Sequence, residues 1–78
     1  MAAKRSKSAA KASKVYKMTE MVGTSTVSFD KASAAAVERA CETLRNVDWF
    51  QVTELRGAVR DGKVHEYQVT LKVGFRLD

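Results

Sequence analysis

Proline is missing from this sequence, and cysteine and histidine each occur once, as Cys41 and His65. A single cysteine excludes a disulfide within the chain, and there is no paired-ligand spacing for a structural zinc ion. The 78 residues make one small domain, and a chain of this size buries only about 60% of its unfolded surface. We therefore expect oligomerisation to supply the stability that a lone subunit lacks.

Long apolar runs are missing too. No stretch is long enough to span a membrane, and residues 1–14 lack the apolar segment of a signal peptide. One unpaired cysteine is compatible with a reducing compartment, so we predict a cytoplasmic protein.

Acidic residues are absent from residues 1–14, which hold five basic residues and no large apolar side chain. From residue 15 onward nine basic and nine acidic residues balance, so the net charge of +5 belongs to the first 14 residues. We predict a flexible basic tail over 1–14 and a domain over 15–78.

The domain is predicted to have the order β-α-β-β. Residues 15–22 are rich in β-compatible side chains and indicate a first strand. Three candidate helix N-caps follow, Ser25, Thr26 and Ser28, and the sequence does not choose between them. From Phe29 to Val47 the apolar residues take helical spacing and predict one helix, with Cys41 expected as a small buried group.

Two long strands are expected after the helix, over 48–60 and 63–77. Asp61-Gly62 between them is typical of a two-residue hairpin turn, since both positions need positive φ. The fold class is α+β, an antiparallel sheet with one helix on one face. Such long strands leave edges that must be covered or paired, which again favours self-association.

Counting from that turn places Trp49 on the polar face of the hairpin. An ideal register gives these facing pairs: Arg60 with Lys63, Leu55 with Gln68, Val52 with Leu71, and Trp49 with Gly74. Trp49 then has space beside its ring and can stack on a planar heteroaromatic ligand, although it can instead pack under the helix or in a subunit contact. The same register puts Arg56 on the opposite face. Gly57 is a candidate for a β-bulge.

Trp49 and the position opposite Gln68 are six residues apart, or roughly 20 Å along a strand. A ligand that uses both must therefore lie between subunits. Asp48, Glu54 and Asp61 form no evident acid–base pair, and His65 is expected to be a solvated strand residue. With no phosphate loop, nucleophile motif or metal cluster in the sequence, we predict a protein that is not an enzyme.

Four fragments in order, VYKMTEMVGTS, ETLRNVDWF, VTELRG and EYQVTLKVGFRLD, resemble the dodecin family. The resemblance covers essentially residues 15–78. It implies a three-stranded sheet that wraps its helix, assembled as a hollow homododecamer. It also implies flavin binding in pairs at two-fold interfaces, between tryptophans of two subunits. The basic tail is not part of the family pattern.

Eight positions match the family's ligand-contacting residues. Trp49 matches the stacking tryptophan, Gln68 the glutamine on the pyrimidine edge of the flavin, and Asp48 and Arg56 further flavin-contacting positions. FMN is a common ligand in bacterial members, with riboflavin and FAD as alternatives. Basic positions that resemble a coenzyme A site in some members are Lys17, Arg39, Arg45 and Arg76.

The resemblance implies storage, buffering and photoprotection of flavin without turnover. The basic tail supports a different function, a nucleic-acid-associated protein whose binding is salt-sensitive. A scaffold with a vestigial pocket is a further alternative.

Overall fold

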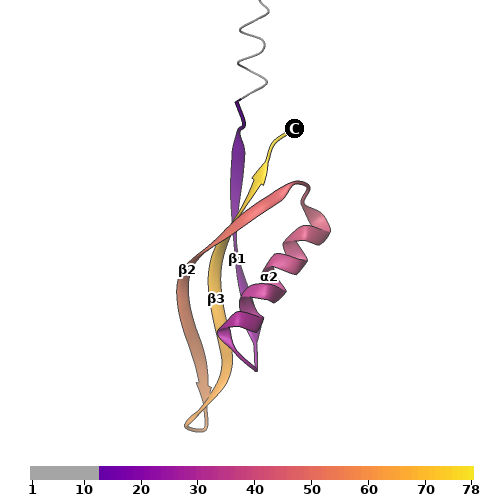
Figure 1. The fold of residues 1–78 in the computed structure, drawn as a ribbon. Helices are drawn as coiled ribbons and strands as arrows, with labels where there is room; N and C mark the ends of the chain where they lie inside the picture. Colours follow the sequence, from indigo (N-terminus) through magenta and orange to yellow (C-terminus); the bar gives the residue numbers. More distant parts are fainter. Residues whose placement is uncertain (1–12) are drawn as a thin grey trace, which may run out of the picture.

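In the computed structural model, which describes residues 13–78, a helix packs on one side of a three-stranded antiparallel sheet (Figure 1). The elements in chain order are β1 (Tyr16–Ser25), α2 (Phe29–Thr43), β2 (Val47–Arg60) and β3 (Lys63–Arg76). The strand order in the sheet is β1-β3-β2, so β3 is central. The predicted β-α-β-β order is confirmed, and most of the predicted tail lies outside the described residues.

Ser28 is the N-cap of α2, which settles the three candidates. Its hydroxyl oxygen accepts a hydrogen bond from the backbone N–H of Lys31 at 3.0 Å, as a capping residue does. The Ser25 hydroxyl instead closes the preceding turn, because it accepts from the backbone N–H of Val27 at 2.9 Å. Among the described residues, no helix is long and apolar enough to cross a membrane.

The helix ends at Thr43, four residues before the predicted end at Val47. Leu44 is already extended, and Asn46 adopts a left-handed backbone with φ of 62°. Leu44 and Val47 still pack against the core, but they do so from the connection and from β2. Leu44 and Val47 therefore fit the helical spacing of apolar residues although both lie outside the helix.

A narrow alanine stripe joins α2 to the sheet. The buried core consists of Ala32, Ala36 and Ala40 from α2 with Val69, Leu71 and Val73 from β3. Small side chains let the helix approach so closely that a Cβ at Gly23 on β1 would meet the Ala36 Cβ at 2.9 Å. The prediction that Cys41 is buried is wrong for this chain, because one residue past Ala40 the helix surface turns outward and Cys41 is exposed.

The predicted turn and both ends of the hairpin register are confirmed. Asp61 and Gly62 have φ of 53° and 74°, the signs that a type I′ turn needs. The confirmed facing pairs are Arg60 with Lys63, Val52 with Leu71, and Trp49 with Gly74.

The middle of the hairpin departs from the ideal register. An extra residue on β2, Thr53, shifts the pairing by one, and a second irregularity near Ala58 restores it before the turn. Gln68 therefore faces Arg56, and the predicted pairing with Leu55 is wrong. The Thr53 hydroxyl anchors the bulge by donating to the Thr70 carbonyl oxygen at 3.2 Å.

The bulge also changes the face on which Arg56 lies. Val69, Leu71 and Val73 point toward α2, so alternate residues of β3 and their cross-strand partners point away from it. We call this second side the outer face. It carries Tyr16, Glu20, Trp49, Glu54, Arg56, Glu66, Gln68, Lys72 and Gly74. The prediction that placed Arg56 and Gln68 on different faces of the sheet is wrong, because the extra residue at Thr53 inverts the alternation of the β2 residues that follow it.

Candidate functional site

Trp49 lies across the central strand on the outer face. Three indole atoms of Trp49 are the nearest neighbours of the position that a Gly74 Cβ would take. Gly74 is consequently buried, whereas Trp49 is 40% exposed. The indole occupies the space left by the missing side chain and still presents part of its surface to solvent.

Tyr16 supports the indole from the other edge of the sheet. The Tyr16 and Trp49 ring centroids are 4.7 Å apart with the planes tilted by 50°, within the usual range for aromatic pairs. Since Tyr16 is on β1 and Trp49 on β2, the ring pair bridges all three strands above Gly74.

Asp48 fixes Tyr16 in turn. It has no cross-strand partner on β3, because an irregularity in the β2–β3 pairing falls at its position. The Tyr16 hydroxyl donates to Asp48 Oδ2 at 3.0 Å. This hydrogen bond, with loss of solvation and the Asp48 charge, raises the pKa of Tyr16 above its ordinary 10.0, while Arg76 acts to lower it.

A polar chain occupies the outer face farther along the hairpin. Arg56 Nε donates to Gln68 Oε1 at 2.9 Å, and Gln68 Nε2 donates to Glu66 Oε1 at 3.0 Å. At the other end, Arg56 Nη1 donates to Glu54 Oε1 at 2.9 Å. The order along the chain is Glu66, Gln68, Arg56, Glu54.

Within one subunit the aromatic cluster and the polar chain are separate. Trp49 faces Gly74, and six residues of β3 lead from Gly74 to Gln68, which corresponds to roughly 20 Å. Of the four predicted flavin-contacting residues, the fold pairs Trp49 with Asp48 at one end and Arg56 with Gln68 at the other. A ligand that contacts both pairs needs a second subunit.

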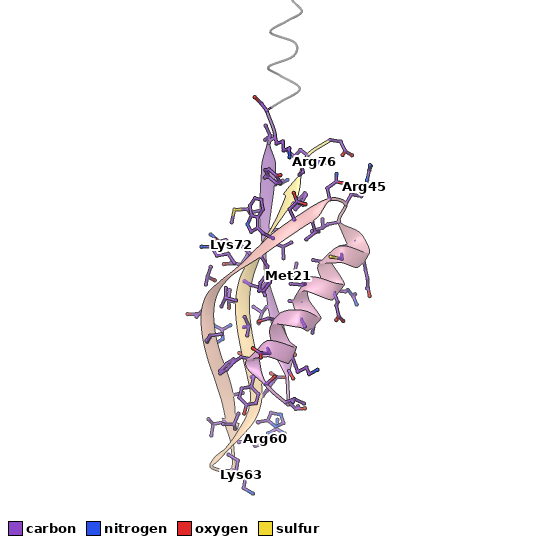
Figure 2. The ribbon with its side chains drawn as sticks, in the orientation of Figure 1. Met21, Arg45, Arg60, Lys63, Lys72 and Arg76 are labelled. Atoms are coloured by element: carbon purple, nitrogen blue, oxygen red, sulfur yellow. The ribbon has the colours of Figure 1, made fainter. Side chains whose placement is uncertain are left out.

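The four predicted coenzyme A residues are only partly brought together. Arg45 and Arg76 lie at the end of the molecule that carries the C-terminus (Figure 2), where the Arg76 backbone N–H donates to the Asn46 carbonyl oxygen at 3.0 Å. Lys17 belongs to the same end, facing Phe75. Arg39 lies earlier on α2, with its Nε 3.9 Å from Glu42, and Arg45 forms an ion pair with Asp78 at 3.0 Å.

Three residues of these clusters did not stand out in the sequence. Tyr16 reaches Trp49 only through the pairing of β1 with β3, which no local pattern predicts. In the sequence, Glu54 and Glu66 look like ordinary surface charges. Their contacts with Arg56 and Gln68 form because the bulge at Thr53 puts Arg56 opposite Gln68. Within residues 13–78, there is no group of three or more His, Cys, Asp or Glu side chains that could hold a metal ion.

A family model described as Dodecin matches residues 15–78 of this chain. The chain belongs to the dodecin family. A dodecin from Thermus thermophilus is 54% identical over 65 residues, which are 83% of this chain and 94% of that relative. The structure of the dodecin from Streptomyces coelicolor superposes with a TM-score of 0.83 at 51% identity, over 86% of this chain and 96% of that one.

A more distant relative is the calcium dodecin of Mycobacterium tuberculosis, 33% identical over 63 residues, covering 81% of this chain and 89% of that relative. Its crystal structure, described as having a novel calcium-binding site, matches with a TM-score of 0.73 at 35% identity, over 82% of this chain and 91% of that one. Membership supports two general properties for this dodecin, binding of small molecules and self-association.

Proposed function

We propose that this dodecin binds flavin without chemical turnover and stores, buffers and photoprotects it in the cytoplasm. The ligand is FMN, riboflavin or FAD, and the store is a homododecamer in which flavin pairs stack between Trp49 side chains of two subunits. The observation that carries the proposal is the indole of Trp49, held above Gly74 on the outer face with 40% of the residue exposed.

An indole held in this way is suited to stacking on an isoalloxazine ring. Tyr16 and the backbone at Gly74 limit the rotamers of Trp49, so little conformational entropy is lost when a ligand stacks on it. Each aromatic pair contributes about 0.5–1.5 kcal/mol beyond the buried area. Close contact with indole quenches the excited flavin, and burial limits its encounters with oxygen, which together account for photoprotection and storage.

The polar chain supplies the edge contacts of the same ligand. Gln68 is assigned to the pyrimidine edge, and Arg56 to a ring carbonyl or a phosphate, since a guanidinium has five N–H donors and two are engaged here. Asp48 contributes through its free carboxylate oxygen. Because Gly74, which faces Trp49, lies six positions from Gln68 along β3, the stacking and the edge contacts come from different subunits.

Exposed apolar surface on the helix side of β2 supports the assembly. Phe50, Val52 and Leu55 are all exposed, and Leu55 is 56% exposed. Phe50 and Val52 also line an open hollow of about 470 Å³ together with Ala34 and Val37 of α2. Contiguous apolar surface of this kind is usually covered by a partner. Sedimentation at micromolar concentration is expected to show the dodecamer, and a monomer alone would contradict this part of the proposal.

Flavin fluorescence tests the ligand and the site together. Wild-type protein is expected to quench FMN and riboflavin emission in a saturable titration, and Trp49→Ala is expected to abolish the quenching. Val64→Ala is the matched control, because it removes an exposed apolar side chain beside the hairpin turn. Sedimentation of each variant separates loss of the site from loss of the assembly. Quenching that survives in Trp49→Ala defeats the assignment of Trp49.

Coenzyme A is proposed as a second ligand, on the observation that Arg45 and Arg76 gather at one end of the molecule (Figure 2). The phosphates of coenzyme A suit guanidinium groups, with Lys17 and Arg39 as further contacts. Titration calorimetry is expected to detect binding that Arg45→Ala weakens. Arg60→Ala, which removes an arginine at the opposite end, is expected to leave it unchanged, and equal effects of the two variants contradict the assignment.

A further inference from the structure

Gln68 is held at both ends of its amide. Its oxygen accepts from Arg56 Nε at 2.9 Å, and its nitrogen donates to Glu66 Oε1 at 3.0 Å. An amide side chain can present its oxygen and nitrogen in either of two orders, related by a half-turn. With the Arg56 donor at one end and the Glu66 carboxylate at the other, only one of these two orientations satisfies both hydrogen bonds.

Glu66 is placed for this task by the strand it shares with Gln68. The two residues are two positions apart on β3 and therefore point to the same face. The cross-strand partner of Glu66 is Ala58, which offers no side-chain donor to compete for the carboxylate. Arg56, by contrast, divides its donors between Gln68 and Glu54.

We propose that Glu66 is a positioning residue that fixes the order in which the Gln68 amide presents its remaining donor and acceptor to the flavin. The inference rests on the proposed function. Each of the two hydrogen bonds uses one of two lone pairs on the oxygen or one of two hydrogens on the nitrogen. One acceptor site on the Arg56 side and one donor on the Glu66 side stay available to a ligand.

That pair is complementary to the pyrimidine edge of a flavin, where the N3–H group lies between two carbonyl groups. The amide oxygen accepts from N3–H while the amide nitrogen donates to a neighbouring carbonyl. With the ring held in position by stacking on Trp49, turning the amide over would place like groups against each other at both contacts, so a fixed orientation decides recognition. Glu66 contacts Gln68 and no part of the flavin in this arrangement.

The test compares riboflavin with N3-methylriboflavin, which lacks the N3 hydrogen. Wild-type protein is expected to bind riboflavin about tenfold more tightly than the methylated form, because a hydrogen bond is lost and a polar group is left unpaired. In Glu66→Ala the amide keeps only the hydrogen bond from Arg56, so its orientation is held less firmly, and the preference is expected to fall to about twofold.

Two further variants complete the comparison. Glu66→Gln keeps an acceptor oxygen without the charge, and its preference is expected to be intermediate, about fourfold. If Glu66→Ala fails to assemble, Glu66→Gln alone tests the role of Glu66. Glu20→Ala is the matched control, because Glu20 lies on the same outer face, opposite Lys72, and its side chain makes no hydrogen bond or ion pair with the rest of residues 13–78. The control is expected to keep the wild-type preference.

The ratio of the two affinities separates positioning from a general loss of structure, because a loosened assembly weakens both ligands equally. Unchanged preference in Glu66→Ala and Glu66→Gln overturns the role of Glu66 and leaves flavin binding intact. Equal binding of both flavins by the wild type overturns the role of Gln68 and this inference with it. If the wild type binds neither flavin, the proposed function itself fails.

Discussion

Trp49 and Gly74 face each other across the β2–β3 hairpin, and the indole of Trp49 occupies the space that a side chain at position 74 would need. From there the ring reaches Tyr16 on the far edge of the sheet. A residue without a side chain on the central strand thus lets one tryptophan connect all three strands. The same arrangement gives the outer face a partly exposed aromatic surface, on which we propose that flavin stacks.

Gly74→Ala is expected to displace the indole, since the added Cβ would collide with three of its atoms. Overpacking of this kind costs about 1–3 kcal/mol, and we expect flavin affinity to fall about tenfold. Trp49 is the only tryptophan, so near-UV circular dichroism reports its displacement directly. Gly57→Ala is the control, because its Cβ meets the Glu66 carbonyl oxygen at 3.3 Å and lies away from the indole. An unchanged Trp49 spectrum in Gly74→Ala would contradict the packing of the indole over Gly74.

Asp48→Ala is expected to lower the pKa of Tyr16 toward 10.0, because the hydrogen bond and the negative charge that raise it are both removed. Tyrosinate absorbance measures the shift, with Tyr67→Phe as the background for both proteins so that Tyr16 alone titrates. A Tyr16 titration that is the same with and without Asp48 would refute the coupling.

The same raised pKa predicts the sign of a pH effect on stability. The protonated hydroxyl is the form that donates to Asp48, so its contribution is complete below pH 10.0. It is lost as the pH rises through the higher pKa of the folded state. Urea unfolding at several pH values, compared between wild type and Tyr16→Phe, is expected to show the two curves converging above pH 10.0.

Gly23→Ala is expected to destabilise the subunit, because its Cβ would meet the Ala32 carbonyl oxygen and the Ala36 Cβ, where the helix lies close to β1. The Ala32 backbone has little room to move away, so we expect a loss at the upper end of about 1–3 kcal/mol. The midpoint of urea unfolding measures it. Thr24→Ala, on the neighbouring outward-facing position, is expected to change the midpoint by less than about 0.5 kcal/mol. Equal changes in the two variants would show that the close approach of α2 to Gly23 does not restrict the side chain at position 23.

Removing residues 1–14 is expected to leave flavin quenching unchanged, because the residues proposed to contact flavin all lie within 15–78. The same truncation tests the alternative based on the tail charge. Binding of nucleic acid that is salt-sensitive in the full chain and absent from the truncated one would support a separate role for the tail. Loss of flavin quenching on truncation would contradict the division into tail and domain.

The sequence alone determined the order of elements, the hairpin turn and the location of Trp49. Each depends on short-range chemistry: a switch from helical to alternating spacing, two residues that accept positive φ, and a register that can be counted from the turn. Trp49 is 12 positions before Asp61 and Gly74 is 12 positions after Gly62, so their pairing followed directly. The family resemblance pointed to the same tryptophan through its motif.

Only the tertiary structure decided how the middle of the sheet is aligned and what surrounds the tryptophan. Thr53 is an ordinary strand residue in sequence, and no local pattern marks it as the extra residue that shifts the β2–β3 register. That one inserted residue brought Arg56 onto the face of Gln68. The contact of Tyr16 with Trp49 likewise required β1 to pair with β3, an alignment between segments about fifty residues apart that no local pattern specifies.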